Sequence, residues 1–270
     1  MAKNSGNYYS GICGISSSTL KIIAISAMLL DHIAAAFEDQ LSGTLFCFSV
    51  GGLPLPRLIG RIAFPIFAFL IAEGASRTKN IYKYMLRLLI FAFISEIPFD
   101  LALFHTPLNE VLFETEHQNV FFTLLLGLLA IYAFQMFQKI RLEVLSFPIL
   151  LILSFIAETL LKTDYGAMGV ICIFLLYVFL HAPGAAKHIG ITLTLLLLPF
   201  IIKSSASKPG NYIYFNTMLY YNSFEIYAVL ALPFILLYNG EKGKKLNKYF
   251  FYGFYPGHLA IIWVIYKIFA

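Results

Sequence analysis

The chain has 270 residues, of which 60% are hydrophobic and only 12% are Asp, Glu, Lys or Arg. Soluble domains carry about 45–50% apolar and about 25% charged residues, so this chain lacks the polar side chains that would cover a soluble fold. The net charge of +5 is modest, and in a membrane protein it marks cytoplasmic loops, so no nucleic-acid partner is expected. The three cysteines, Cys13, Cys47 and Cys172, lack the spacing of metal ligands, and we expect neither a disulfide nor a metal site.

Nine segments are long and apolar enough to be considered as membrane spans. A helix needs about 20 apolar residues to cross the hydrocarbon core of a bilayer. Without an internal repeat or a linker, the sequence predicts one domain over residues 1–270, an all-α bundle of about nine transmembrane helices. The expected spans are 20–37, 56–74, 84–104, 119–137, 143–161, 166–181, 188–203, 222–239 and 251–269.

The loops between these spans predict the orientation of the chain. Lys and Arg are concentrated after the second, fourth, sixth and eighth spans, and the intervening loops are poorer in them. By the positive-inside rule the N-terminus is cytoplasmic and the C-terminus lies outside. The first apolar run reaches Asp31 and His32 without the short core and cleavage site of a signal peptide, so we expect a multi-pass protein of the cell membrane.

The first span contains three ionisable residues, Lys21, Asp31 and His32. Such residues cost roughly a few kcal/mol each within a bilayer and therefore suggest a function. Lys21 and His32 lie eleven residues apart, which is three helical turns and places them on one face. A neutral imidazole can take a proton from an amine or a hydroxyl when a second group fixes its tautomer. The alternative for His32 is a buried, hydrogen-bonded packing residue.

The second and third spans add charges of both signs. Arg57 and Arg61 share one helix face, as do Glu96 and Asp100, because each pair is four residues apart. Arg61 can extend toward the outer surface or pair with a carboxylate. The carboxylates can neutralise Arg61, orient His32 or carry protons.

The loop between these two spans is basic, with Arg77, Lys79, Lys83 and Arg87. These residues either obey the positive-inside rule alone or also hold the phosphates of a cytosolic donor. Later in the chain further polar residues fall in or beside spans, and we expect most of them to join one polar cluster near the outer leaflet. They are Asn119, Asp164, Tyr165, Glu225 and His258, the last nearer the middle of the membrane.

Six segments resemble the TraX family in order over nearly the whole chain: LKIIAISAMLLDHI, RLIGRIAFPIFAFLIAEGASRTKN, YMLRLLIFAFISEIPFDLA, QNVFFTLLLGL, TDYGAMGV and LYNGEKGKKLNKYFFYGFYPGHL. The family is named for a conjugative-plasmid protein that N-acetylates pilin. The resemblance implies a polytopic acetyltransferase of the bacterial inner membrane that uses acetyl-CoA. A weaker similarity links the chain to membrane acyltransferases of surface glycans, whose first helix carries an Arg, ten residues and a His. Lys21 and His32 match that spacing, with Lys in place of Arg.

These features predict acetyl transfer from cytosolic acetyl-CoA to an amine or hydroxyl of an extracytoplasmic acceptor, a pilin-like N-terminus or a glycan. His32 is the expected general base or acetyl carrier, oriented by Asp31 or Glu96, with Arg61 or Asn119 stabilising the oxyanion. The donor would enter by a tunnel from the cytoplasmic side. Its expected ligands are Lys21, Arg77, Lys79, Lys83 and Arg87, and the expected substrate-lining residues are Asp100, Asp164, Tyr165, Glu225 and His258.

Two other functions fit the same residues. In a proton-coupled transporter, the intramembrane His, Asp, Glu and Arg side chains would form a proton relay. In a non-catalytic assembly protein for a surface structure, those side chains would be dispensable for assembly.

Overall fold

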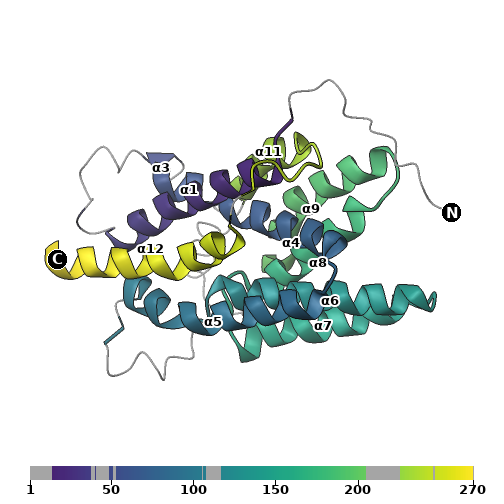
Figure 1. Ribbon diagram of the computed structural model, residues 1–270, viewed down its shortest axis with the longest axis horizontal. Coiled ribbons are helices and arrows are strands. Elements are labelled where there is room, and N and C mark those ends of the chain that lie inside the picture. The colour runs from purple at the N-terminus through teal and green to yellow at the C-terminus, as the bar shows by residue number, and fades with distance from the viewer. Residues whose placement is uncertain are drawn as a thin grey trace.

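A computed structural model describes residues 14–37, 40, 49–50, 53–104, 106–107, 117–204, 226–245 and 247–269. This part of the chain is almost entirely helical (Figure 1). Its short β-structure includes an antiparallel ribbon of β1 (Ser49–Val50) and β2 (Leu53–Pro54). The predicted all-α class is therefore confirmed.

Helices coincide with the nine expected spans, apart from residues 222–225, which lie outside the described residues. The elements are α1 (Ser17–Ala36), α3 (Leu55–Gly60), α4 (Ala63–Arg77), α5 (Ile81–Leu103), α6 (Val120–Lys139), the 3₁₀-helix η3 (Glu143–Leu145), α7 (Ser146–Phe155), the π-helix η4 (Ile156–Leu160), α8 (Gly166–Leu180), α9 (Ala185–Ser204), the 3₁₀-helix η5 (Ile226–Ala231), α11 (Leu232–Leu236) and α12 (Lys248–Phe269).

Four described helical stretches are long and apolar enough, by length and composition, to cross a membrane. Three shorter apolar helices accompany them, so the chain is a membrane protein, while the number of nine spans remains a prediction. The four stretches are Ser17–Ala36, Leu55–Arg77, Val120–Lys139 and Glu143–Leu160, and the shorter helices are Gly166–Leu180, Ala185–Leu197 and Tyr227–Leu236.

The second expected span is one apolar stretch in the sequence but two helices in the structure. Between α3 and α4, the Arg61 N–H bonds to the Leu58 carbonyl at 3.2 Å and the Ile62 N–H to the Ile59 carbonyl at 3.1 Å. These three-residue bonds tighten the chain into a turn. Pro65 then lies in the first turn of α4, where its missing N–H removes no helical hydrogen bond.

The first and last helices lie side by side and run in the same direction (Figure 1). Near their starts, the Lys21 ammonium lies 5.3 Å from the centre of the Phe251 ring. Near their ends, the rings of Phe37 and Tyr266 are 5.8 Å apart. Parallel first and last spans are what the expected orientation requires; which end faces the cytoplasm remains a prediction.

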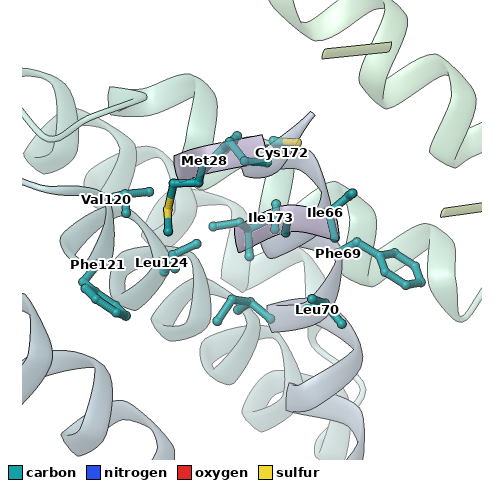
Figure 2. Close-up of a cluster of buried hydrophobic side chains, with 14 of the residues drawn as sticks. Met28, Ile66, Phe69, Leu70, Val120, Phe121, Leu124, Cys172 and Ile173 are labelled. Carbon is teal, nitrogen blue, oxygen red and sulfur yellow. The ribbon is translucent and has the colours of Figure 1, made fainter. Parts of the chain in front are cut away.

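The core is centred on α4, which packs against α1, α6 and α8. Figure 2 shows side chains from these helices in contact, among them Met28, Phe69, Leu124 and Ile173. A Cβ at Gly127 would lie 2.5 Å from Cδ1 of Ile173, so α6 and α8 approach each other as closely as a glycine allows. Small residues at such contacts are typical of helices packed in lipid.

The start of α1 is held by the loop that follows α11. The Ser17 N–H donates to the Glu241 carbonyl at 2.9 Å and the Ser18 N–H to the Lys242 carbonyl at 3.1 Å. Loop carbonyls thus satisfy donors that a helix leaves open at its N-terminus. The residues around 240 therefore lie beside the start of α1 and the C-terminal end of α4, next to the candidate site.

Candidate functional site

A cavity of about 310 Å³ lies among α1, α4, α5, α6 and α12. This is within the size range of small-molecule pockets, about 300–1,000 Å³. Its body is apolar and is built partly from the core seen in Figure 2, with Met28, Leu70, Val120, Phe121 and Leu124 on its wall.

One end of the cavity is lined by three cations, Lys21, Arg77 and Arg87, here called the cationic mouth. The Arg77 side chain is 41% exposed, so the cavity reaches the surface at this end. These three belong to the five cations expected to bind the donor. The other two, Lys79 and Lys83, are exposed and do not line the cavity.

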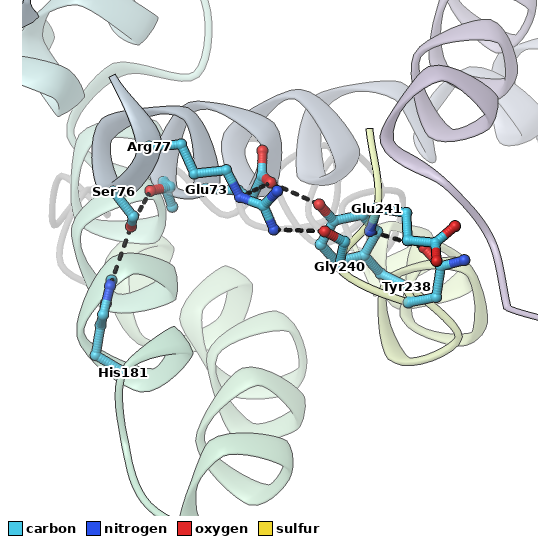
Figure 3. Close-up of polar contacts among 9 residues, drawn as sticks. Glu73, Ser76, Arg77, His181, Tyr238, Gly240 and Glu241 are labelled. Carbon is cyan, nitrogen blue, oxygen red and sulfur yellow. Dashed lines mark hydrogen bonds and ion pairs between the residues drawn. The ribbon is translucent and has the colours of Figure 1, made fainter. Parts of the chain in front are cut away.

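Glu73, for which the sequence suggested no role, holds Arg77 of the mouth in place (Figure 3). Its carboxylate accepts a hydrogen bond of 2.5 Å from the Tyr238 hydroxyl. It also forms an ion pair with Arg77, whose Nε lies 2.5 Å away. Nη2 of Arg77 also donates to the Gly240 carbonyl at 2.6 Å. The sequence does contain a signal for this ion pair, because a carboxylate four residues before an arginine on a helix lies beside it.

The other two cations of the mouth lie on aromatic faces. The Arg87 guanidinium is 5.4 Å from the centre of the Tyr84 ring and 5.9 Å from that of Tyr252, and Lys21 lies over Phe251. Neither Lys21 nor Arg87 forms an ion pair with a carboxylate in the described part of the chain. Ring faces attract a cation without neutralising it, so this end keeps a positive field suited to an anion.

Tyr255 of α12 lines the cavity, and its ring contacts two histidines that are not part of the cavity wall. Nδ1 of His32 is 2.7 Å from Nε2 of His258, and Nδ1 of His258 is 2.7 Å from the Phe254 carbonyl oxygen. The Tyr255 ring meets both imidazoles edge-on, with centres 5.9 Å and 5.7 Å away. We call His32 and His258 the histidine pair; both side chains are buried.

The histidine pair differs from the expected arrangement, in which Asp31 or Glu96 oriented His32. Asp31 instead forms a 3.0 Å ion pair with Arg57 and lies against Gly60, where a Cβ would be 2.3 Å from the Asp31 Cβ. His258, expected only to line the substrate site, takes the position next to His32.

Asn119 is buried and caps α6, with its side-chain oxygen accepting from the Phe121 N–H at 3.0 Å. Its amide nitrogen donates to the Glu96 carboxylate and, at 2.8 Å, to the Ala92 carbonyl. Both donors of the amide are therefore used within the fold. Asn119 therefore has no amide hydrogen left for the oxyanion that it was expected to stabilise.

The profile of the TraX protein family matches residues 16–266. The chain belongs to the TraX family. It is also similar to a curated protein of Dichelobacter nodosus described as "probable fimbrial assembly protein FimC, serogroup H1". The two are 32% identical over 254 residues, which cover 92% of this chain and 94% of that protein. No solved structure matches the chain.

In this TraX-family chain the remaining expected residues lie apart from the cavity wall. Arg61 is half-buried in the turn between α3 and α4, and Asp100 is fully buried in the last turn of α5. Asp164 pairs its N–H with the Gln118 carbonyl at 2.7 Å. Tyr165 stacks on the Phe64 ring at 3.8 Å with a φ of 67°. Glu225 lies outside the described residues.

The expected single polar cluster is thus divided. Asp31 forms an ion pair with Arg57, and Glu96 separately accepts hydrogen bonds from Asn119. The segments around Gln118 and Thr163 form a short bridge that fastens the starts of α6 and α8. The histidine pair and the cavity remain as the candidate functional site of this chain.

Proposed function

We propose that this TraX-family protein is a multi-pass acetyltransferase of the bacterial cytoplasmic membrane. It transfers the acetyl group of cytosolic acetyl-CoA to an amine or hydroxyl of an extracytoplasmic acceptor. The name of the Dichelobacter nodosus relative supports a pilin-like N-terminus as that acceptor; a surface glycan is the alternative.

One observation carries the proposal: an apolar cavity connects the cationic mouth to Tyr255, directly before the histidine pair. Arg77, Arg87 and Lys21 suit the phosphates of CoA, because guanidinium and ammonium groups bind phosphate by charge-assisted hydrogen bonds. The apolar body suits the pantetheine arm, which would carry the thioester toward His32.

His32 acts as the general base in this proposal. Its imidazole takes the proton of the acceptor N–H or O–H as the acceptor nitrogen or oxygen bonds to the acetyl carbon. The carbon–sulfur bond then breaks, and the same proton passes from the imidazole to the departing sulfur. The products are the acetylated acceptor and CoA with a free thiol.

Tyr255 is the proposed donor to the oxyanion, in place of Asn119. The residue is 4% exposed, and its hydroxyl lies near the backbone of Val120 without a hydrogen bond of ordinary geometry to the described part of the chain. It lines the cavity and contacts both histidines. A fixed donor at the position where negative charge develops is often the largest electrostatic contribution to acyl transfer.

Binding of acetyl-CoA to the purified protein in detergent, measured by calorimetry, tests the donor site. Replacing Arg77 and Arg87 together with Gln is expected to weaken binding at least about tenfold, because each charged hydrogen bond contributes about 1.5–3 kcal/mol. The matched control replaces Lys79 and Lys83, which carry the same charge but lie off the cavity, and is expected to bind like the wild type. Folded wild-type protein that shows no saturable binding at millimolar acetyl-CoA would refute the proposal.

A second candidate, a non-catalytic assembly protein, is supported by the description of the Dichelobacter nodosus relative as a probable fimbrial assembly protein. Proteoliposomes supplied with radiolabelled acetyl-CoA and candidate acceptors separate the two functions. Covalent label in an acceptor supports the enzyme. Surface-structure assembly that persists in cells carrying His32→Gln, without label transfer by the wild type, supports the assembly protein.

A further inference from the structure

The hydrogen bonds of the histidine pair determine where its protons lie. The Phe254 carbonyl oxygen only accepts, so Nδ1 of His258, 2.7 Å away, carries the proton of that ring. In a neutral imidazole the other nitrogen is then an acceptor. Nε2 of His258 therefore accepts from His32, whose Nδ1 carries the proton shared over 2.7 Å.

From this chain of hydrogen bonds we infer that His258 is a positioning residue that fixes His32 in the tautomer protonated at Nδ1, leaving Nε2 as the base. The inference rests on the proposed function for its catalytic meaning. Nε2 of His32 makes no hydrogen bond to the described part of the chain. Its lone pair is therefore free to receive the proton of the acceptor.

The surroundings hold the rings in this geometry. The planes of His32 and His258 differ by 6°, with centres 5.0 Å apart, and Phe254 stacks on His258 at 4.9 Å. Tyr255 packs edge-on against both. Because the helices α1 and α12 carry one histidine each, the pair also links the first and last helices of the chain.

The arrangement replaces the carboxylate–histidine pair of many acyl-transfer sites with two imidazoles in series. When Nε2 of His32 takes a proton, the ring becomes a cation and its Nδ1–H bond to His258 strengthens as a charge-assisted hydrogen bond. His258 exchanges no proton during the reaction; it accepts the same hydrogen bond before and after. A neutral partner avoids placing a carboxylate in the bilayer, where its charge is costly.

Nitrogen-15 spectra of histidine-labelled protein in nanodiscs test the tautomer directly. The signals of His32 among the six histidines are assigned by their loss in His32→Gln. The wild type is expected to show a protonated Nδ1 and a bare Nε2 at His32, and His258→Leu is expected to reverse them. A bare Nδ1 in the wild type, or spectra of His32 unchanged by His258→Leu, would overturn the inference.

Kinetics test the catalytic consequence. His258→Leu is expected to lower kcat by about 10²- to 10⁴-fold without raising KM for acetyl-CoA, as for the loss of a general base. His258→Gln, whose amide oxygen can accept from Nδ1, is expected to recover at least about tenfold of that loss. His188→Leu on α9 is the control and is expected to leave kcat unchanged. Equal kcat in the Leu variant and the wild type would refute the positioning role.

The two experiments separate this inference from the proposed function. A wild type that transfers no acetyl group to any acceptor removes the proposed function, while the nitrogen-15 spectra still decide the tautomer. A wild type that transfers acetyl groups, with His258 variants of equal rate and unchanged spectra, removes the inference alone.

Discussion

Two carboxylates of this bundle are each balanced by a neighbouring arginine. Asp31 is paired with Arg57, and Glu73 with Arg77. Each pairing reduces the cost of placing a charge near lipid. The histidine pair differs because its members bond to each other and to a backbone carbonyl. This leaves Nε2 of His32 without a hydrogen bond to the described part of the chain.

Tyr255→Phe tests the proposed oxyanion donor, since it removes only the hydroxyl and keeps the ring against both histidines. We expect kcat to fall by about 10²- to 10³-fold, the usual effect of losing one such donor, with little change in acetyl-CoA binding. Tyr266→Phe, on the same helix but away from the cavity, serves as the control. A Tyr255→Phe enzyme with wild-type kcat would assign the hydroxyl to structure instead.

For single residues, the sequence predicted some of the side chains that belong to the candidate site but not which side chains they contact. His32 was identified from its position in an apolar helix, but its contact with His258 joins residues 226 positions apart. No local pattern encodes such a contact. Asn119 carried a signal that was overlooked: an Asn directly before an apolar run is a typical helix N-cap.

Among the elements, hydropathy located the helices well because the length of apolar segments reflects the thickness of the bilayer. It could not resolve the break at Arg61 and Ile62, since a window of about 20 residues averages over a two-residue turn. The π-helical end of the fifth span, Ile156–Leu160, was hidden for the same reason.

Contact between α6 and α8 gives a prediction at the scale of elements. In Gly127→Ala the new Cβ would lie 2.5–2.8 Å from three carbons of Ile173, so one helix must shift. We expect a loss of about 1–3 kcal/mol of stability, the usual cost of overpacking, and a lower unfolding midpoint in detergent.

The matched control is Gly253→Ala in α12, where a Cβ meets nothing within 4 Å. Alanine favours a helix over glycine by about 0.5–1 kcal/mol, so this variant should melt at or above the wild-type temperature. Two variants with the same midpoint would show that α6 and α8 can separate without cost.

The molecule as a whole has a different set of polar groups at each of its two ends: cations that line the cavity at one, and an ion pair at the other. The cationic mouth, the starts of α1 and α12 and the end of α4 lie at one end, with the loop around Gly240. The Asp31–Arg57 pair lies toward the other end of α1. The positive-inside rule predicts that the first end is cytoplasmic, the side on which acetyl-CoA is available.

Cysteine labelling in intact cells tests this orientation. In a background with Cys13, Cys47 and Cys172 replaced by Ser, Gln40→Cys is expected to react with a membrane-impermeant maleimide, and Lys242→Cys only after permeabilisation. Both parent side chains are exposed, so access to the reagent depends on the side of the membrane. The reverse pattern would place the cationic mouth outside the cell, where acetyl-CoA is absent. Because the cations of that mouth are the proposed ligands of the donor phosphates, the reverse pattern would refute both the orientation and acetyl-CoA as the donor.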